Sequence, residues 1–223
     1  MKIYLPACLF LIAVRLMGKI FSISTYDLTA DPAEIAGKLP YIGFFSNVGN
    51  LLWCGAAAIC IFTAFLTKVD QTTARRWFIF LLASFFLTVS LLLDDLFQIH
   101  EYYHAIFFAF QKVDVPLKDK TMQNIFELLY MCAMYLGPFG LYIFYFRKYF
   151  RHTEYLYFIL AIFFFTLSIV IDMTPETLLP EHFFIEDGAK LLGIFSWLTY
   201  FYRTCNSIMR QLIAKLALHP DQG

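Results

Sequence analysis

The most reactive pattern in the sequence is a stretch of two histidines and one glutamate, His100-Glu101-Tyr102-Tyr103-His104. On a helix, His100 and His104 lie one turn apart on the same face, so both imidazoles can bind one metal ion. Glu101 would then lie beside the metal-bound water, where its carboxylate can act as a general base. The stretch predicts a divalent metal site, for zinc or iron, with Glu101 as the catalytic residue.

Carboxylates elsewhere in the chain are candidates for the remaining metal ligands. An ionisable side chain within a membrane span is costly unless it is paired, faces a cavity or binds an ion. Several acids fall near the ends of apolar runs, where they would meet the histidines at one level of a helical bundle. The expected ligands beside His100 and His104 are Asp94, Glu127, Asp172 and Glu186, with Asp95 as an alternative to Asp94.

Composition identifies the kind of protein that must position these residues. The chain has 223 residues with no formal net charge, and it is 60% hydrophobic and only 15% charged. Soluble domains are about 25% charged, so a soluble domain is excluded. The absence of a basic excess also argues against nucleic acid as a partner. The five cysteines form no CxxC pair, so no disulfide framework is indicated.

Six apolar runs are long enough to cross a membrane as helices, because about 20 apolar residues span the hydrocarbon layer. They cover approximately residues 3–24, 43–67, 77–100, 123–146, 155–172 and 184–202. The sequence therefore predicts an all-α fold, a polytopic integral membrane helical bundle that forms a single transmembrane domain over residues 1–223. The lipid bilayer is its expected surrounding.

The loops between these runs predict an orientation, because cytoplasmic loops are enriched in Lys and Arg. Residues 68–76, 147–154 and the C-terminal tail carry mostly basic charge, whereas residues 25–42 and 173–183 are mainly acidic. Residues 101–122 are mixed, and the alternation places them outside. We expect a multi-pass protein of the cell (inner) membrane with both termini in the cytoplasm and with the acids and histidines at the outer ends of the helices.

An internal repeat is also predicted. Residues 85–94 (FFLTVSLLLD) align with residues 163–172 (FFFTLSIVID), and three polar pairs match: Thr88 with Thr166, Ser90 with Ser168, and Asp94 with Asp172. Each segment leads to a helix with a glutamate near its outer start. Helices 3–4 and 5–6 are therefore expected to form a parallel repeat, with Glu127 equivalent to Glu186.

Helical spacing sorts the polar residues at the outer ends. One face of the third helix is expected to carry four of them: Asp94, Gln98, Glu101 and His104. On the sixth helix, Lys190 follows Asp187 by three residues and Glu186 by four. Both spacings allow an ion pair, and the sequence leaves open which acid Lys190 neutralises.

Residues 100–104 resemble the HExxH motif of zincin metalloproteases, which membrane-embedded zinc proteases also carry. The resemblance covers five residues, and it implies zinc ligation by His100 and His104 with Glu101 as the base. A wider pattern resembles small, uncharacterised polytopic prokaryotic membrane proteins: Asp-acidic-x4-His-Glu closes one span, and an acidic pair followed by Gly188 opens another. That second resemblance implies no activity.

Three functions compete on these observations. The first is a metal-dependent membrane enzyme, hydrolase-like, that acts on a lipid or a membrane-associated substrate. Nearly level with it is a non-catalytic subunit of a membrane assembly, whose partners would be other membrane proteins or further copies of the chain. An ion or proton transporter or channel ranks third, because the acids gather toward one membrane face and no charged path continues to the other.

Overall fold

The computed structural model describes residues 43–68, 74–99, 132–172 and 182–218, together with a few isolated positions elsewhere. The chain divides into two units, residues 1–44 and residues 45–223. In the first unit, the described positions between residues 12 and 20 are helical. The second unit contains the helices that position the candidate site.

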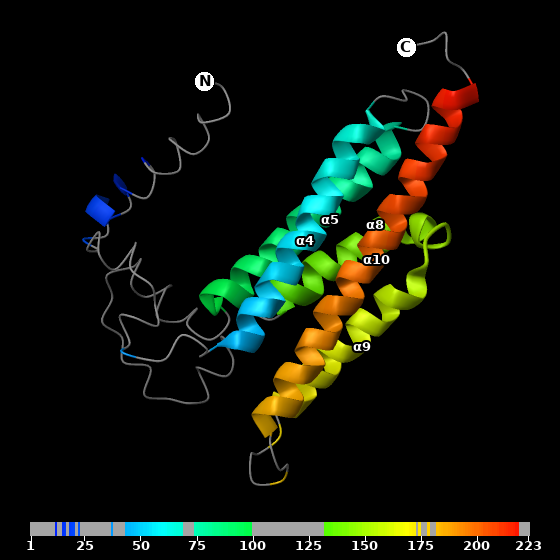
Figure 1. Ribbon diagram of the computed structural model, residues 1–223. Coiled ribbons are helices and arrows are strands. Elements are labelled where there is room, and N and C mark those ends of the chain that lie inside the picture. Colours follow the sequence, from blue (N-terminus) through cyan, green and yellow to red (C-terminus); the bar gives the residue numbers. More distant parts are fainter. Residues whose placement is uncertain are drawn as a thin grey trace. The chain divides into compact units, whose positions relative to one another are not determined.

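The described part of the second unit consists of helices (Figure 1). In chain order they are α4 (Phe44–Thr67), α5 (Ala74–Phe97), the π-helix η1 (Cys132–Leu136), α8 (Gly137–Phe150), α9 (Tyr155–Asp172) and α10 (His182–Leu218). No strand occurs within these residue ranges. The all-α prediction is therefore confirmed for the part of the chain that the structure describes.

Three of the described helices are long and apolar enough to cross a membrane: Phe44–Thr67, Trp77–Phe97 and Tyr155–Asp172. They coincide with the second, third and fifth predicted spans. Helix α10 starts close to the sixth predicted span but continues for 37 residues. At 1.5 Å per residue it is about 55 Å long, well beyond the ~30 Å of a hydrocarbon layer.

Aromatic side chains and small residues join α4, α9 and α10. Trp53 of α4 stacks on Phe165 of α9 at 5.7 Å and meets the edge of Trp197 of α10 at 6.0 Å. A Cβ atom at Gly193 of α10 would lie only 2.6 Å from the Phe165 ring. The missing side chain therefore lets α9 and α10 approach closely, as small residues do between membrane helices.

Tyrosines at seven-residue spacing join α8 to α5. The Tyr142 hydroxyl lies 2.7 Å from Oγ of Ser84, and the Tyr149 ring meets Trp77 edge-on at 5.3 Å. The later tyrosine contacts the earlier part of α5, so the two helices run antiparallel. A seven-residue spacing keeps one face toward a partner that crosses at a small angle.

The two segments of the predicted repeat differ in their surroundings. In each matched polar pair, one residue is buried and the other is exposed. Thr88 and Asp94 are buried, whereas their partners Thr166 and Asp172 are exposed. In the third pair the order is reversed, because Ser168 is buried and Ser90 is exposed. The matched side chains therefore do not pack in the same way. The expected equivalence of Glu127 and Glu186 lies outside the described residues, because Glu127 is not among them.

Candidate functional site

The end of α5 carries a buried carboxylate. Asp94 is only 6% exposed, and its Oδ2 accepts a hydrogen bond from the hydroxyl of Tyr135 in η1. Tyr135 lies seven residues before Tyr142, so it extends the line of tyrosines that faces α5. This hydrogen bond holds the Asp94 carboxylate in one orientation.

The local backbone explains how Tyr135 reaches this position. Residues Cys132–Leu136 form a π-helix that ends where α8 begins, one residue before Pro138. Proline has no N–H, so it cannot donate the α-helical hydrogen bond to the carbonyl four residues earlier. Single π-turns next to such interruptions rotate the helical face that precedes them and are frequent at functional sites.

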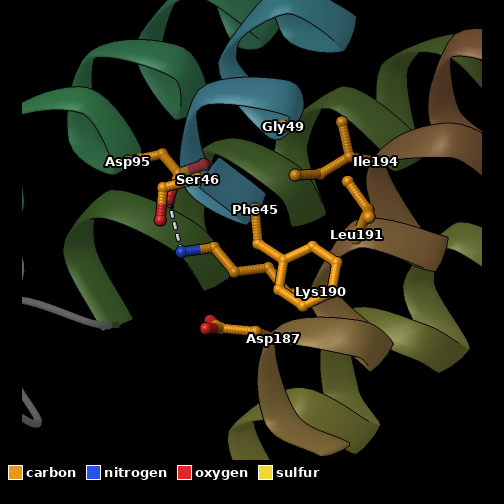
Figure 2. A pocket seen from close by; sticks show the side chains of 8 residues that line it. All are labelled: Phe45, Ser46, Gly49, Asp95, Asp187, Lys190, Leu191 and Ile194. Atoms are coloured by element: carbon orange, nitrogen blue, oxygen red, sulfur yellow. Dashed lines mark ion pairs between the residues drawn. The ribbon is translucent and has the colours of Figure 1, made fainter. Parts of the chain in front are cut away.

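The neighbouring carboxylate, Asp95, forms an ion pair with Lys190 of α10 (Figure 2). The Asp95 side chain is 9% exposed and the Lys190 side chain 35%. Sequence spacing offered Lys190 two acids on its own helix, Asp187 and Glu186. In the structure, Lys190 instead pairs with an acid of α5. The partner of Lys190, which the sequence left open, therefore lies on another helix.

Helix α4 packs closely against this ion pair. A Cβ atom at Gly49 would lie 3.1 Å from Cδ1 of Ile194 and 3.9 Å from Oδ2 of Asp95. Gly49, Phe45 and Lys190 line a recess of about 10 Å³ (Figure 2). That volume holds one water molecule at most. The ion pair therefore connects helices, and the recess beside it is too small for a ligand.

A second group of polar residues lies where α9 ends and α10 begins. Nε2 of His182 donates a hydrogen bond to the Ile171 carbonyl at 2.7 Å, and Nδ1 lies 3.9 Å from Oε2 of Glu186. Glu186 is also within electrostatic range of Asp172 and Lys190. Asp172 and Glu186, two of the predicted ligands, thus lie near each other, and Lys190 connects this group with Asp95.

Four of the predicted site residues, His100, Glu101, His104 and Glu127, lie outside the described residues. Helix α5 ends at Phe97, and Gln98 has a φ of 49°. A residue in this left-handed conformation typically terminates a helix. The helical face predicted to run from Asp94 to His104 is therefore interrupted at Gln98.

The described residues alone do not form a metal centre. No group of three or more His, Cys, Asp or Glu side chains within the described ranges is arranged to hold a metal ion. Asp95 is paired with Lys190, and Asp94 is held by Tyr135. A metal site that uses Asp94 would therefore need ligands from residues such as His100 and His104, as the motif predicts.

A large apolar groove starts at Asp94 and Tyr135. It has a volume of about 700 Å³ and lies between α5 on one side and η1 with α8 on the other. Its walls are mainly aromatic and aliphatic, and they include Phe86, Leu91 and Leu141. The sequence patterns did not lead to a prediction of Tyr135 or of this groove. The seven-residue spacing of Tyr135, Tyr142 and Tyr149 nevertheless indicates that the three tyrosines share one helical face.

The opposite end of the α9–α10 pair carries a different ion pair. Nη2 of Arg203 donates to Oε1 of Glu154 at 2.7 Å. This hydrogen bond raises the pKa of Arg203, because the carboxylate stabilises the charged guanidinium. Nearby, the Thr153 hydroxyl lies 3.1 Å from the Tyr200 hydroxyl. Both ends of the two helices are thus held by polar contacts.

Comparison with known proteins places the chain in a family. Neither a curated protein nor a solved structure matches it. The similarity of residues 100–104 to zinc proteases therefore stays a prediction. One family model matches residues 3–204, a range that contains all six predicted spans. The chain belongs to this family, which is described as Domain of unknown function (DUF8692).

Proposed function

We propose that this protein is a six-span integral membrane protein of the cell membrane, with both termini in the cytoplasm. The three apolar helices α4, α5 and α9 support a membrane location. The alternation of basic and acidic loops supports the orientation. The length of α10 fits a span near residues 184–202 followed by a cytoplasmic extension that begins at Arg203.

The predicted repeat of helices 3–4 and 5–6 is part of this proposal. It is supported by the match of residues 85–94 to residues 163–172. Because the matched polar residues differ in burial, the proposal is restricted to common descent of the two hairpins. Their polar residues would since have acquired different neighbours, with Asp94 facing Tyr135 and Asp172 near Glu186.

The proposed activity is that of a metal-dependent, hydrolase-like membrane enzyme that acts on a lipid or a membrane-associated substrate. One observation carries this proposal: the buried Asp94 carboxylate is oriented by Tyr135 and lines an apolar groove. Asp94 also precedes His100 by only six residues. Hydrogen bonds of this kind orient carboxylate ligands and tune the bound metal.

In this proposal, His100, His104 and Asp94 hold a zinc or iron ion, and Glu127, Asp172 and Glu186 are the further candidate ligands. The metal would polarise the bond to be hydrolysed and lower the pKa of a bound water. Glu101 would take the proton from that water. The groove would present the substrate from the membrane, which excludes bulk water from the reaction.

Metal analysis of the purified full-length protein tests this proposal. We expect about one zinc or iron ion per chain, since a site with neutral imidazole and carboxylate ligands retains its metal at neutral pH. The variants His100→Ala and His104→Ala should lose it. His152→Ala is the matched control, because His152 is exposed in the loop between α8 and α9 and should leave the metal content unchanged.

If the protein holds no stoichiometric metal and is equally stable with and without a chelator, the proposed metal-dependent enzyme activity is contradicted. This result would favour the second candidate, a non-catalytic subunit of a membrane assembly.

A specific observation supports the candidate function of a non-catalytic subunit. The Asp95–Lys190 pair and the hydrogen bond from Trp197 to Thr88, 3.0 Å long, both connect α5 to α10. Polar side chains often hold membrane helices together in this way without any catalytic role.

A further inference from the structure

The groove between α5 and α8 has the volume of a binding site. Its volume of about 700 Å³ lies within the ~300–1,000 Å³ typical of small-molecule sites. Along α5 it extends from Ala83 to Asp94, which corresponds to about 16 Å of helix. Hydroxyl groups line it along this whole length: Ser90, Tyr135, Tyr142 and Tyr145. They therefore do not mark one end of the groove as the place where a polar head group binds.

The end of the groove near Ala83 adjoins a positive charge. Phe144 lies at this end, because α5 and α8 run antiparallel and the Ser84 hydroxyl contacts that of Tyr142. The guanidinium of Arg147 lies over the Phe144 ring, 5.2 Å from its centroid. A cation–π contact of this kind positions the guanidinium without using its N–H donors, which can still bind a phosphate in pairs.

Two more basic residues share this face of α8. Lys148 follows Phe144 by four residues and Arg151 by seven, spacings that keep all three on one side of a helix. The backbone of Arg151 is still helical, with φ −67° and ψ −20°. The side chains of Arg147, Lys148 and Arg151 are exposed. They are called the basic cluster below.

The charge of the basic cluster is not neutralised by the carboxylates that the structure describes. Within those residue ranges, no salt bridge joins an acid to any of the three side chains. The nearest acid in the sequence, Glu154, is paired with Arg203. A helix C-terminus alone favours cations, so basic residues there do not by themselves indicate a ligand. Here, however, Arg147 lies on a ring that lines the groove, which places the charge beside an apolar binding surface.

Several walls of the groove are open at the surface. The exposed fractions are 59% for Phe86, 71% for Leu141 and 68% for Phe144. In a membrane these side chains would contact lipid, so an acyl chain can enter from the side. Burial of apolar surface gives little selectivity there, because lipid tails are as apolar as the groove. Selection therefore depends on the head group, and basic residues at a membrane surface attract anionic lipids.

We infer that the groove binds an anionic phospholipid, with the phosphate at the basic cluster and one acyl chain lying along α5. This lipid is a resident component and not the substrate of the proposed enzyme, because its ester bonds lie at the phosphate end, away from Asp94. A substrate chain would have to displace it. The inference goes beyond the proposed function: it requires the proposed membrane location but not the metal.

Two phospholipids with identical acyl chains, each with a photoactivatable group in one chain, test this inference: phosphatidylglycerol, which is anionic, and phosphatidylcholine, which is zwitterionic. Each is added to the purified full-length protein in phosphatidylcholine nanodiscs, and the cross-linked peptides are mapped by mass spectrometry. We expect phosphatidylglycerol to label α5 and α8 at least about fivefold more than phosphatidylcholine, since one basic residue at a membrane surface changes binding by about that factor. Equal labelling by both, or labelling spread evenly over the apolar helices, would overturn the inference.

An excess of inorganic phosphate separates a lipid site from a site for the free anion. It should leave the labelling by phosphatidylglycerol unchanged, whereas unlabelled phosphatidylglycerol should compete. Loss of labelling in inorganic phosphate would show that the basic cluster binds the free anion, and the lipid assignment would be wrong.

Charge variants locate the head group. Arg147→Gln should lower the ratio of phosphatidylglycerol to phosphatidylcholine labelling by about fivefold, and Arg147→Lys, which keeps the charge, should retain most of it. Arg210→Gln is the matched control, because Arg210 is exposed on α10 and does not line the groove. It removes the same charge from the same proposed side of the membrane. An equal effect of Arg147→Gln and Arg210→Gln would indicate attraction to the whole surface and contradict the site.

Tryptophan variants locate the acyl chain. Leu141→Trp places an indole in the groove and should lower the labelling of α5 severalfold. Leu51→Trp is the control, because Leu51 is 72% exposed on α4, compared with 71% for Leu141, and does not line the groove. An equal response of the two variants would contradict a chain in the groove. Peptide mapping of the unaltered protein decides the question if a variant does not fold.

Metal analysis of the same preparations separates this inference from the proposed enzyme. Selective labelling by phosphatidylglycerol in a protein that contains no zinc or iron would contradict the metal enzyme and leave the inference standing. A metal-loaded protein that is labelled equally by both phospholipids would contradict the inference and leave the metal site standing.

Discussion

Two adjacent carboxylates at the end of α5 contact different helices. Successive residues of a helix are rotated by about 100°, so Asp94 faces Tyr135 of η1 while Asp95 faces Lys190 of α10. The charge of Asp95 is thereby used to connect helices. Asp94 lines the apolar groove instead.

The Asp95–Lys190 pair predicts a loss of stability on Lys190→Met. Removing the ammonium leaves the largely buried Asp95 carboxylate without its cation. We expect a loss of about 1–3 kcal/mol in the free energy of unfolding, since Lys190 itself is partly exposed. Tryptophan fluorescence during unfolding in mixed detergent micelles measures the change.

Two further variants make this test specific. Lys148→Met changes an exposed lysine of α8 and should stay within about 0.5 kcal/mol of the unaltered protein. The double variant Asp95→Leu with Lys190→Met removes both charges and should recover most of the lost stability. If Lys190→Met and Lys148→Met behave alike, the ion pair does not stabilise the bundle.

At the scale of the helices, packing depends on small residues and on a regular series of tyrosines. Tyr142 and Tyr149 contact α5, while Gly193 allows the Phe165 ring to lie against α10. Since the Phe165 ring also stacks on Trp53, it cannot move away from Gly193 without disturbing the contact with α4. The contact at Gly193 therefore affects three helices.

Substitution of two glycines in α10 tests this packing. Gly193→Ala places a methyl group 2.6 Å from the Phe165 ring, which must then shift. We expect a loss of about 1–3 kcal/mol, as for other overpacked contacts. Gly188→Ala meets no atom within 4 Å, so its helix propensity should leave stability equal or raise it by up to about 1 kcal/mol. Thermal unfolding in detergent compares the two, and a gain for both variants would refute the close contact.

For the whole molecule, the two ends of the α9–α10 pair differ in charge. His182, Glu186 and Asp172 lie at one end, and Arg203 with Glu154 lies at the other. Under the proposed orientation, the acidic end faces outward and the end with Arg203 faces the cytoplasm, as the enrichment of basic residues in cytoplasmic loops requires.

Labelling of single cysteines tests the orientation. In a cysteine-free background, we expect a membrane-impermeant maleimide to label Asp31→Cys on intact cells and to label Arg151→Cys only after permeabilisation. The basic loop that contains Arg151 should stay in the cytoplasm. Labelling of Arg151→Cys on intact cells, or no labelling of Asp31→Cys, would exclude the proposed topology.

Helices α4 and α9 were predicted closely from the sequence. The predicted spans 43–67 and 155–172 agree with α4 and α9 to within one residue at each end. Membrane helices are encoded locally, because a continuous apolar run determines where the chain is stable in hydrocarbon. The end of α5 was predicted three residues too late, because its termination depends on the backbone conformation of Gln98, which no apolar pattern specifies.

The contacts between helices were decided only by the tertiary structure. Periodicity tells which residues share a helical face, but it does not tell which helix that face will meet. Lys190 had two acids within reach on its own helix, yet it pairs with Asp95, because Gly49 lets α4, α5 and α10 come close together. Tyr135 reaches Asp94 only because a π-turn precedes Pro138. Of the candidate site residues, Asp94, Asp172 and Glu186 lie near helix ends, as the sequence predicted. The hydrogen bonds and the groove arise from packing between segments far apart in the chain, which periodicity does not specify.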